Sequence, residues 1–231
     1  MIINYMNIRL MCTKTKNVVI FGSNDFAELA HFYLTTDSEY NVVGFTVNEA
    51  YKTTDRFKSL PVVTFESLLT EFPPNEVLLF IPMVGIKMNE VRKTLYLSAK
   101  EMGYNFITYV SSKSTNLSES IGENCFILED NTLQPFTKIG NNVILWSGNH
   151  IGHHSIIEDH VFFTSHIVLS GHCRVKQNSW IGVNSTIRDG VTIGESTLIG
   201  MGSLITKSTD DYGFYLGSPA KKQINKSIDV L

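Results

Sequence analysis

The chain has 231 residues, of which 43% are hydrophobic and 18% are charged, and its formal net charge is −3 at pH 7. This composition is typical of a folded globular protein and excludes a disordered chain. A slightly negative charge with no run of lysine or arginine argues against nucleic acid as a partner. Small molecules and further copies of the chain are the expected partners.

Residues 1–16 contain neither a long apolar core nor a small-residue cleavage site, so we interpret them as a loose leader without targeting meaning. We expect no transmembrane segment and no membrane partner. Two of the three cysteines, Cys125 and Cys173, fall at positions where a small buried side chain is expected. Buried thiols fit a reducing compartment, and a cytoplasmic protein is expected.

Residues 17–112 are predicted to form an α/β domain. Val18–Phe21 is an apolar run that ends at Gly22, and a helix over 25–34 follows, with Asn24 or Asp25 as its N-cap. Such alternation implies a small parallel sheet with helices on its faces. Further strands are expected at 40–47, 60–63, 77–81 and 106–110, and further helices at 65–71 and 89–102.

A ligand of this domain is expected at the carboxyl ends of its strands. The first turn has one glycine where the dinucleotide fingerprint needs three, so NAD is not expected. A mononucleotide or nucleotide sugar is allowed, and a merely structural glycine turn is the alternative. The residues selected by this rule are Gly22, Ser23, Asn24, Thr46, Pro82, Met83 and Gly85.

Residues 113–211 follow a six-residue repeat. Every sixth residue from Ile121 to Ile205 is a branched aliphatic residue or phenylalanine, a period that fits neither a helix nor an ordinary strand. The residue two positions earlier is small or β-branched, as the interior of a narrow coil requires. Each hexad is therefore interpreted as a short strand plus a corner, and three hexads close one triangular turn of a parallel β-helix with about five coils.

The residue between the two inward positions of each hexad must point outward. One outward column is apolar throughout, which is too continuous to leave in water. We expect it to form a subunit interface, and a homotrimer is the natural closed assembly of triangular prisms. Coverage by the chain's own N-terminal domain or tail is the alternative. The column consists of Phe126, Ile144, Phe162, Trp180 and Leu198.

Six of the seven histidines lie between residues 150 and 172. Four of them share one hexad position, which indicates corner packing: His154, His160, His166 and His172. His153 breaks this register and is the sharper candidate for a general base, with a structural histidine as the alternative. His154 and His172 lie one turn apart, so a metal site is geometrically possible, but no further ligand set is obvious and no metal is expected.

Four segments carry a resemblance: Ile-Gly-Glu-Asn, Ile-Gly-Asn-Asn, His-Ile-Gly-His-His and Leu-Gly-Ser-Pro-Ala-Lys. They resemble the two-domain left-handed β-helix (hexapeptide-repeat) sugar acetyltransferases. The resemblance implies a small Rossmann-like βαβ domain at 17–112, a left-handed parallel β-helix at 113–211 and a C-terminal tail at 212–231. It also implies that acetyl-CoA is the co-substrate and a nucleotide-linked amino sugar the partner.

Carried over onto this sequence, the resemblance implies that Gly22, Ser23 and Asn24 bind the nucleotide and that His153 is the base. The acidic residue expected after the base is replaced by His154, so His154, Glu158 or Asp159 is expected as its partner. A second family histidine corresponds to Phe162. The resemblance implies acetyl-CoA contacts at Phe162, Ser170, Gly171, Gly182, Arg188, Gly200 and Lys221.

The function expected from all of these features is N-acetylation of a nucleotide-linked amino-deoxy sugar for surface glycan synthesis, with a 4-amino-4,6-dideoxyhexose as the expected sugar. O-acetylation of a sugar hydroxyl is the nearest alternative. A β-helix zinc lyase of the carbonic anhydrase type and a non-catalytic binding trimer are the others.

Overall fold

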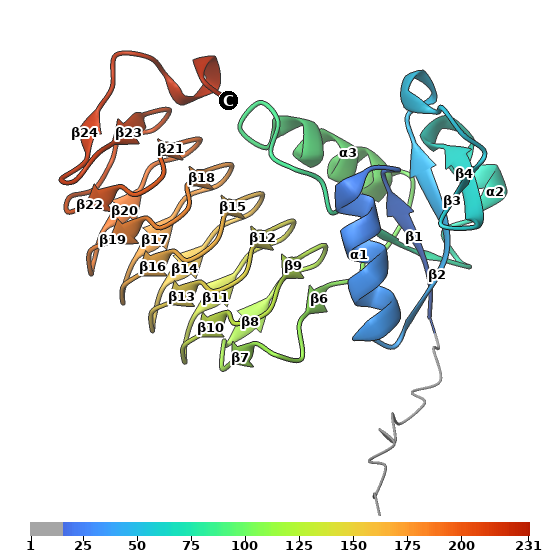
Figure 1. Ribbon diagram of the computed structural model, residues 1–231, viewed down its shortest axis with the longest axis horizontal. Coiled ribbons are helices and arrows are strands. Elements are labelled where there is room, and N and C mark those ends of the chain that lie inside the picture. The colour runs from blue at the N-terminus through green and yellow to red at the C-terminus, as the bar shows by residue number, and fades with distance from the viewer. Residues whose placement is uncertain (1–15) are drawn as a thin grey trace, which may run out of the picture.

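The computed structural model describes residues 16–231, which form an α/β part followed by a β-helix (Figure 1). The expected leader, residues 1–16, lies outside the described residues except for Lys16. In the part of the chain that is described, no helix is long and apolar enough to cross a membrane.

The α/β part contains one five-stranded sheet in the order β3, β4, β2, β1, β5. Neighbouring strands are parallel except in the β3–β4 hairpin. That hairpin was not predicted, because Lys58 and Ser59 adopt positive φ at its turn where Gly or Asn would have marked it. The elements are β1 (Lys16–Phe21), α1 (Asp25–Thr36), β2 (Tyr40–Val47), β3 (Arg56–Phe57), β4 (Leu60–Thr64), α2 (Leu68–Glu71), β5 (Leu78–Phe80) and α3 (Glu90–Glu101), with single 3₁₀ turns at Glu49–Tyr51 and Phe65–Ser67.

The predicted alternation of strands and helices is confirmed up to α3, but the last predicted strand, 106–110, is wrong in part. Phe106 makes only an isolated bridge to Leu79. Tyr109–Val110 is β6, which pairs with the first coil of the β-helix instead. Within residues 106–110 the chain passes from the α/β sheet to the β-helix. Phe106 therefore packs in the core of the α/β part, whereas Tyr109 and Val110 pair with the β-helix.

The helices cover opposite faces of the α/β sheet. The side-chain oxygen of Asn24 accepts a hydrogen bond from the backbone N–H of Ala27 at 3.3 Å and so begins α1, as predicted. The buried face of α1 packs with β1 on the side that meets the β-helix, whereas α2 and α3 pack against the other face of the sheet. The α/β part therefore meets the repeat domain through α1 and also through α3, whose Arg92 bonds to Asn142 of the β-helix (Figure 1).

Three parallel sheets form the sides of the triangular β-helix. The six-stranded sheet comprises β7 (Thr115–Asn116), β10 (Thr132–Leu133), β13 (His150–Ile151), β16 (Val168–Leu169), β19 (Thr186–Ile187) and β22 (Leu204–Ile205). The five-stranded sheet of the β-helix comprises β8 (Ser120–Ile121), β11 (Lys138–Ile139), β14 (Ile156–Ile157), β17 (Arg174–Val175) and β20 (Thr192–Ile193).

The eight-stranded sheet is the third side. Its last two strands belong to the C-terminal tail: β23 pairs in parallel with β21, and β24 turns back along β23. The tail thus caps the last coil, and it ends in a 3₁₀ turn at Ser227–Asp229. The strands are β6, β9 (Phe126–Ile127), β12 (Ile144–Leu145), β15 (Phe162–Phe163), β18 (Trp180–Ile181), β21 (Leu198–Ile199), β23 (Phe214–Leu216) and β24 (Lys221–Lys222).

The hexad interpretation is confirmed by the interior of this prism. The large residue of every hexad is buried, apart from the partly buried Ile121 at the first coil, and so is each small residue two positions earlier. Neighbouring coils pair at an offset of 18 residues, as in Thr132 with His150. Cys125 and Cys173 are free and buried, as expected, and burial raises the pKa of the Cys125 thiol to about 12.

The subunit interface predicted on the apolar column is wrong. Phe126, Ile144 and Phe162 are buried within one chain, in a core that they share with α1 and β1. Phe80 of the α/β part packs edge-on against Phe126, with ring centroids 5.2 Å apart. The alternative is confirmed for this face, because the chain's own N-terminal part provides the cover that the apolar side chains require.

Candidate active site

Four histidines occupy the corner position of successive hexads. The φ angles of His154, His160, His166 and His172 lie between 56° and 64°. Asn124, Asn142, Asn178 and Asn184 take the same left-handed conformation at the same hexad position. This position favours Asn, Asp, His and Gly. The corner packing predicted for the four histidines is thus what the backbone shows, and His153 stands outside it.

His153 lies at the corner between β13 and β14, which joins the six-stranded and five-stranded sheets of the β-helix. This is the corner that does not border the eight-stranded sheet. The backbone N–H of His153 donates to the side-chain oxygen of Gln134 at 2.9 Å. The ring is exposed, and its Nδ1 lies 3.1 Å from Nδ1 of His154. The backbone of His153 is thus fixed by a hydrogen bond while its imidazole stays exposed, so the ring is available to exchange a proton with a substrate.

The ring of His153 rests over Gly171 of the next coil. A methyl group added at Gly171 would lie 2.8 Å from Cε1 and Nε2 of that ring and 3.0 Å from Oδ1 of Asp189. The imidazole and the Asp189 carboxylate thus both lie close to the same point above Gly171. Asp189 was not predicted. The sequence could have indicated it, because Asp189 follows His153 by 36 residues, which is two coils of 18, and so falls at the same corner.

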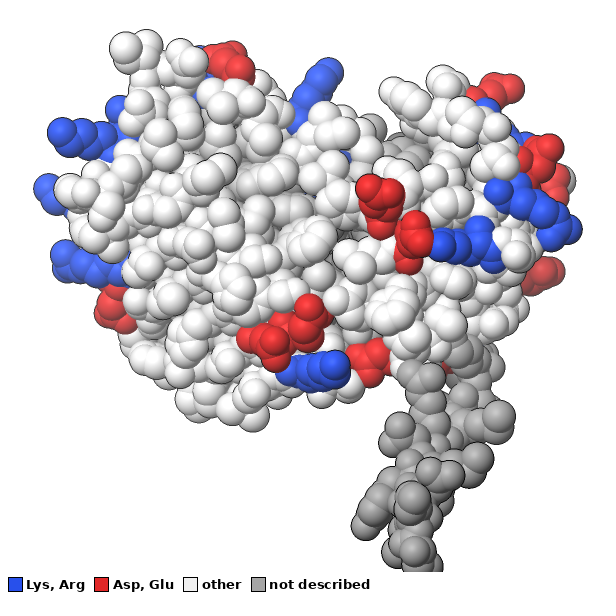
Figure 2. All heavy atoms as spheres, in the orientation of Figure 1, with Lys and Arg blue, Asp and Glu red and all other residues white. Residues whose placement is uncertain are grey.

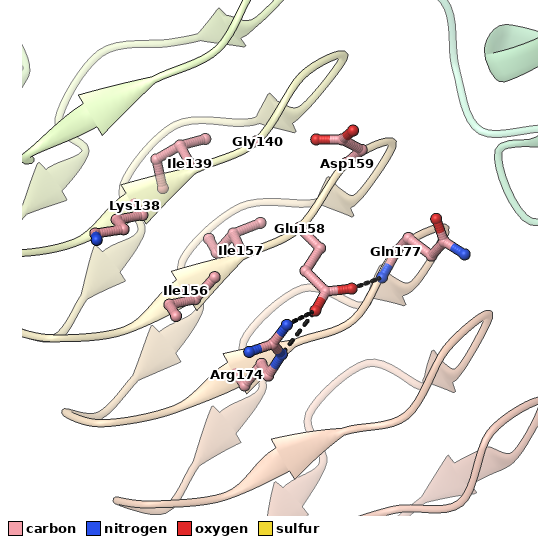
Figure 3. A pocket seen from close by; sticks show the side chains of 9 residues that line it. All are labelled: Lys138, Ile139, Gly140, Ile156, Ile157, Glu158, Asp159, Arg174 and Gln177. Atoms are coloured by element: carbon pink, nitrogen blue, oxygen red, sulfur yellow. Dashed lines mark hydrogen bonds and ion pairs between the residues drawn. The ribbon is translucent and has the colours of Figure 1, made fainter.

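Glu158 and Asp159, the carboxylates predicted to assist His153, lie at a different corner. They follow β14, whereas His153 precedes it. Figure 3 shows Glu158 turned toward Arg174 over a shallow groove. Its carboxylate pairs with the guanidinium at 2.5 Å and accepts the Gln177 N–H at 3.1 Å. Asp159 accepts the N–H of Asn141 at 2.7 Å. Within one chain both carboxylates are committed elsewhere, because the strand between the corners separates them from His153.

The residues predicted to contact acetyl-CoA fall into separate groups. Ser170, Gly171 and Arg188 share the corner of His153, since they follow β16 and β19. Gly182 and Gly200 follow β18 and β21 and line the corner between the eight-stranded and six-stranded sheets. The exposed Lys221 lies in β24 of the tail.

Phe162 is a wrong prediction for a coenzyme contact. It is 2% exposed and stacks on Trp180 with ring centroids 4.4 Å apart, inside the contact with the α/β part. The nine-residue spacing from His153 brings the chain to another side of the prism, so the two positions do not meet within one chain.

A cavity of about 540 Å³ lies in the α/β part, where β1 and β2 end and the loop after β5 passes. Four of the predicted residues line it: Gly22, Ser23, Asn24 and Met83. Thr46 is buried, and its carbonyl oxygen accepts the Gly22 N–H at 2.8 Å, so it shapes the turn from behind. Pro82 and Gly85 are outside the lining, and Gly85 packs against Trp180. Tyr51 and Lys87 line the cavity and were missed, although both follow carboxyl strand ends.

Three histidines gather at the His153 corner. The rings of His154 and His172 stack with centroids 4.9 Å apart, and the ring of His153 stands edge-on to both. One ring nitrogen of each lies within 4.8 Å of the others. The sequence predicted that His154 and His172 lie one turn apart. The structure shows that the ring of His153 joins them at the same corner.

The sequence profile described as "Bacterial transferase hexapeptide (six repeats)" matches residues 120–153 and 172–207. The matched residues lie in the β-helix and carry its six-residue repeat. The hexapeptide repeats thus include the His153 corner, whose Gly152 and His153 close the first matched segment. Comparison with curated proteins gives no match.

Several solved structures match most of the chain. A mutant of perosamine N-acetyltransferase from Caulobacter crescentus, in complex with CoA and GDP-perosamine, is 20% identical with a TM-score of 0.81, over 90% of this chain and 97% of that one. The acetyltransferase domain of PglB from Neisseria gonorrhoeae is 20% identical with a TM-score of 0.77, over 90% and 100%. WeeI from Acinetobacter baumannii is 21% identical with a TM-score of 0.76, over 90% and 100%.

These likenesses establish the fold. The expected fold class, a small Rossmann-like βαβ domain followed by a left-handed parallel β-helix of about five coils, is confirmed. The hexapeptide repeats stack as one prism, with one side covered by the α/β part and two sides open.

Proposed function

We propose that this protein is an acetyl-CoA-dependent N-acetyltransferase that acts on the amino group of a nucleotide-linked amino-deoxy sugar, with a 4-amino-4,6-dideoxyhexose as the favoured sugar. The observation that carries the proposal is the exposed His153 ring over Gly171, beside Asp189, on a hexapeptide-repeat fold shared with an N-acetyltransferase that holds CoA and GDP-perosamine. A related acetyltransferase domain is seen with acetyl coenzyme A.

In this proposal His153 acts as the general base. The sugar amine attacks the thioester carbonyl carbon, and the nitrogen passes its proton to the His153 imidazole. The carbon–sulfur bond then breaks, and the departing sulfur takes the proton from the His153 imidazolium, so that CoA leaves as the thiol and His153 returns to its neutral form. Backbone amides along the corner stabilise the negative charge that develops on the carbonyl oxygen. Direct attack is favoured over an acyl intermediate on a cysteine of the β-helix, because Cys125 and Cys173, the cysteines among the described residues, are both buried.

Asp189 is proposed as the positioning residue for this base. Its Oδ1 and the His153 ring both lie within about 3 Å of the position that a Cβ atom at Gly171 would take. A neighbouring carboxylate favours the imidazolium that forms during proton transfer. This role replaces the one expected for Glu158 and Asp159, which have partners at the next corner.

The cavity that Gly22, Ser23 and Asn24 line is proposed to bind the nucleotide. Asn24 caps α1 there, and backbone N–H groups at the start of a helix suit a phosphate. Lys87 adds a positive side chain at the cavity wall. The sugar would then extend from the cavity toward a base on the β-helix.

This arrangement supports a homotrimer whose active sites are shared between subunits. The α/β part covers the eight-stranded sheet, whereas His153 lies at the opposite corner of the same prism. A nucleotide sugar held in one chain therefore reaches a base most directly on a neighbouring chain. Much of the β-helix surface in Figure 2 carries no charged side chain, which suits such contact. The six-stranded and five-stranded sheets take the place of the apolar column as the proposed interface.

The decisive experiment is a thiol-release assay with acetyl-CoA and a panel of GDP-, UDP- and dTDP-linked 4-amino-4,6-dideoxyhexoses, with the matched hydroxyl sugars as controls. Release with one amino sugar, abolished in His153→Asn, is the expected result. Release only with hydroxyl sugars would replace N-acetylation by O-acetylation. Absence of both release and CoA-induced thermal stabilisation would favour a non-catalytic binding role.

A further inference from the structure

We propose that His153, His154 and His172 form a binding site for a borderline transition-metal ion, for which Zn²⁺ is the reference. The geometry also points to a consequence: the bound ion occupies the imidazole that the proposed function uses as its base, so metal capture inhibits the enzyme. That consequence rests on the proposed function, whereas the binding site itself does not.

The three side chains converge because of the coil offset. His153 and His154 are consecutive at one corner, and His172 lies above His154 at the same corner of the next coil. The coils are joined there by a hydrogen bond from the His172 N–H to the His153 carbonyl oxygen at 2.9 Å. Nδ1 of His153 already lies 3.1 Å from Nδ1 of His154, and one nitrogen of each ring lies within 4.8 Å of the others.

The surroundings hold these rings in place before any ion arrives. The left-handed backbone at His154 and His172 directs both side chains outward from the corner. Phe136 packs against the ring of His154 with centroids 4.7 Å apart. Gly171 leaves room for the His153 ring, which a side chain there would displace. A preorganised set loses little side-chain entropy when it binds an ion.

The ligand chemistry selects the class of ion. Neutral imidazole nitrogens suit Zn²⁺, Cu²⁺ and Ni²⁺ better than Mg²⁺ or Ca²⁺. Zn–N bonds of about 2.0–2.1 Å in a tetrahedral site place ligand nitrogens about 3.3 Å apart. The His153–His154 pair is already at this separation, and rotation of the His172 ring brings in the third ligand. All three residues are exposed, so water supplies the fourth position.

An ion at this site changes what His153 is able to do. Metal binding and proton acceptance both use a lone pair on a neutral imidazole. A Zn²⁺ ion held by the three rings also fixes the orientation of the His153 ring and places a positive charge beside the incoming amine. We therefore expect reversible inhibition by Zn²⁺ that chelation relieves.

The test uses the full chain and three matched variants. His154→Asn and His172→Asn each remove one ligand and keep a side chain that the left-handed corner accepts, as Asn142 and Asn178 do in other coils. His166→Asn is the control, because His166 is an exposed corner histidine outside the cluster. Zn²⁺ affinity is measured by titration calorimetry, and Co²⁺ is added separately to record its visible absorption.

The expected result is one Zn²⁺ per chain, a visible Co²⁺ band typical of nitrogen ligation, and a loss of affinity of about tenfold or more in His154→Asn and His172→Asn but not in His166→Asn. Unchanged Zn²⁺ affinity in His172→Asn, or no saturable binding by the wild type, overturns the proposal. The ratio of thiol release with and without Zn²⁺, compared across the same variants, tests the inhibition. Saturable binding in a protein without thiol release would uphold the site and reject the proposed function.

Discussion

The guanidinium of Arg92 on α3 is fully buried and donates a hydrogen bond to the side-chain oxygen of Asn142 in the β-helix at 3.0 Å. The same guanidinium reaches the carbonyl oxygen of His160 at 3.0 Å and the side chain of Asn89 at 3.2 Å. Burial among these neutral oxygens lowers the pKa of Arg92 to about 9. One side chain thus joins the α/β part to two consecutive coils.

Arg92→Leu is expected to destabilise the protein by about 3 kcal/mol or more, because the substitution leaves several buried carbonyl oxygens without a donor. Urea unfolding at neutral pH measures the effect. Arg56→Leu, at an exposed strand, serves as the control and should change stability little. A loss below about 1 kcal/mol in Arg92→Leu would mean that the carbonyl groups find other partners.

Gly171→Ala is expected to lower turnover sharply with little effect on folding. The added methyl group would lie 2.8 Å from the His153 ring, so the ring must move from its place beside Asp189. Thiol release and thermal unfolding measure the two effects separately. Gly202→Ala is the control for turnover, since a methyl group there meets nothing within 4 Å and the residue lies at another corner. Because φ of Gly202 is 66°, this control is itself expected to lose about 1 kcal/mol of stability. Equal turnover in both variants would show that the observed ring position is not the working one.

Asp189→Asn is expected to reduce kcat roughly tenfold or more while KM for the nucleotide sugar stays near its wild-type value, because the carboxylate orients the base and does not hold the substrate. Asp189→Glu should restore part of the loss. Glu158→Gln serves as the comparison, because its carboxylate pairs with Arg174 at the next corner. Steady-state kinetics decide between them, and a larger loss in Glu158→Gln would return the partner role to Glu158, one of the three residues that the sequence offered.

His160 is expected to make the fold sensitive to acid. Burial first, and then the nearby Arg92 and Lys93, lower the pKa of His160 to about 4, while Asp159 opposes the shift. Asn142 lies 2.9 Å from Nδ1 of His160 through its side-chain nitrogen, which requires that Nδ1 carry no proton. As pH falls below the ordinary value of 6.5, the unfolded chain binds a proton that the native state does not, so stability decreases until about pH 4.

His160→Asn removes this dependence. Relative to the wild type, the variant should gain about 2 kcal/mol of stability between pH 7 and pH 5. Denaturant unfolding at the two pH values measures the change. His166→Asn, an exposed corner histidine, should follow the wild type. Parallel stability curves for His160→Asn and wild type would show that His160 titrates normally in the folded protein.

The proposed sharing of active sites between subunits predicts complementation between inactive subunits. His153→Asn removes the base, and Ser23→Trp fills the cavity of the α/β part. Each variant alone should show almost no thiol release. Subunits mixed after mild dissociation should regain part of the activity, because some sites then pair an intact cavity with an intact base. If mass spectrometry confirms that mixed assemblies form and they nevertheless stay inactive, the cavity and the base of one site belong to the same chain.

Much of the fold is predictable from local pattern. The period of six predicts a repeating strand and corner. The small residue two positions before each large one indicates that the interior of the coil is narrow. The αL corners explain why Asn, Gly and His recur at one position. The Gly22 turn was likewise found, because a strand, a glycine and a capped helix are adjacent in the chain.

The sequence by itself determined the two-part organisation and singled out His153 as the candidate base, since both depend on residues close together in the chain. Only the tertiary structure decided what covers the column from Phe126 to Trp180, because an apolar surface does not specify which surface will bury it. Only the stacking of coils placed Asp189 beside His153 and moved Glu158 out of reach. In a β-helix, two side chains come close when they lie at the same corner of neighbouring coils. Glu158, five residues after His153, therefore lies at a different corner, whereas Asp189, 36 residues after it, lies at the same one.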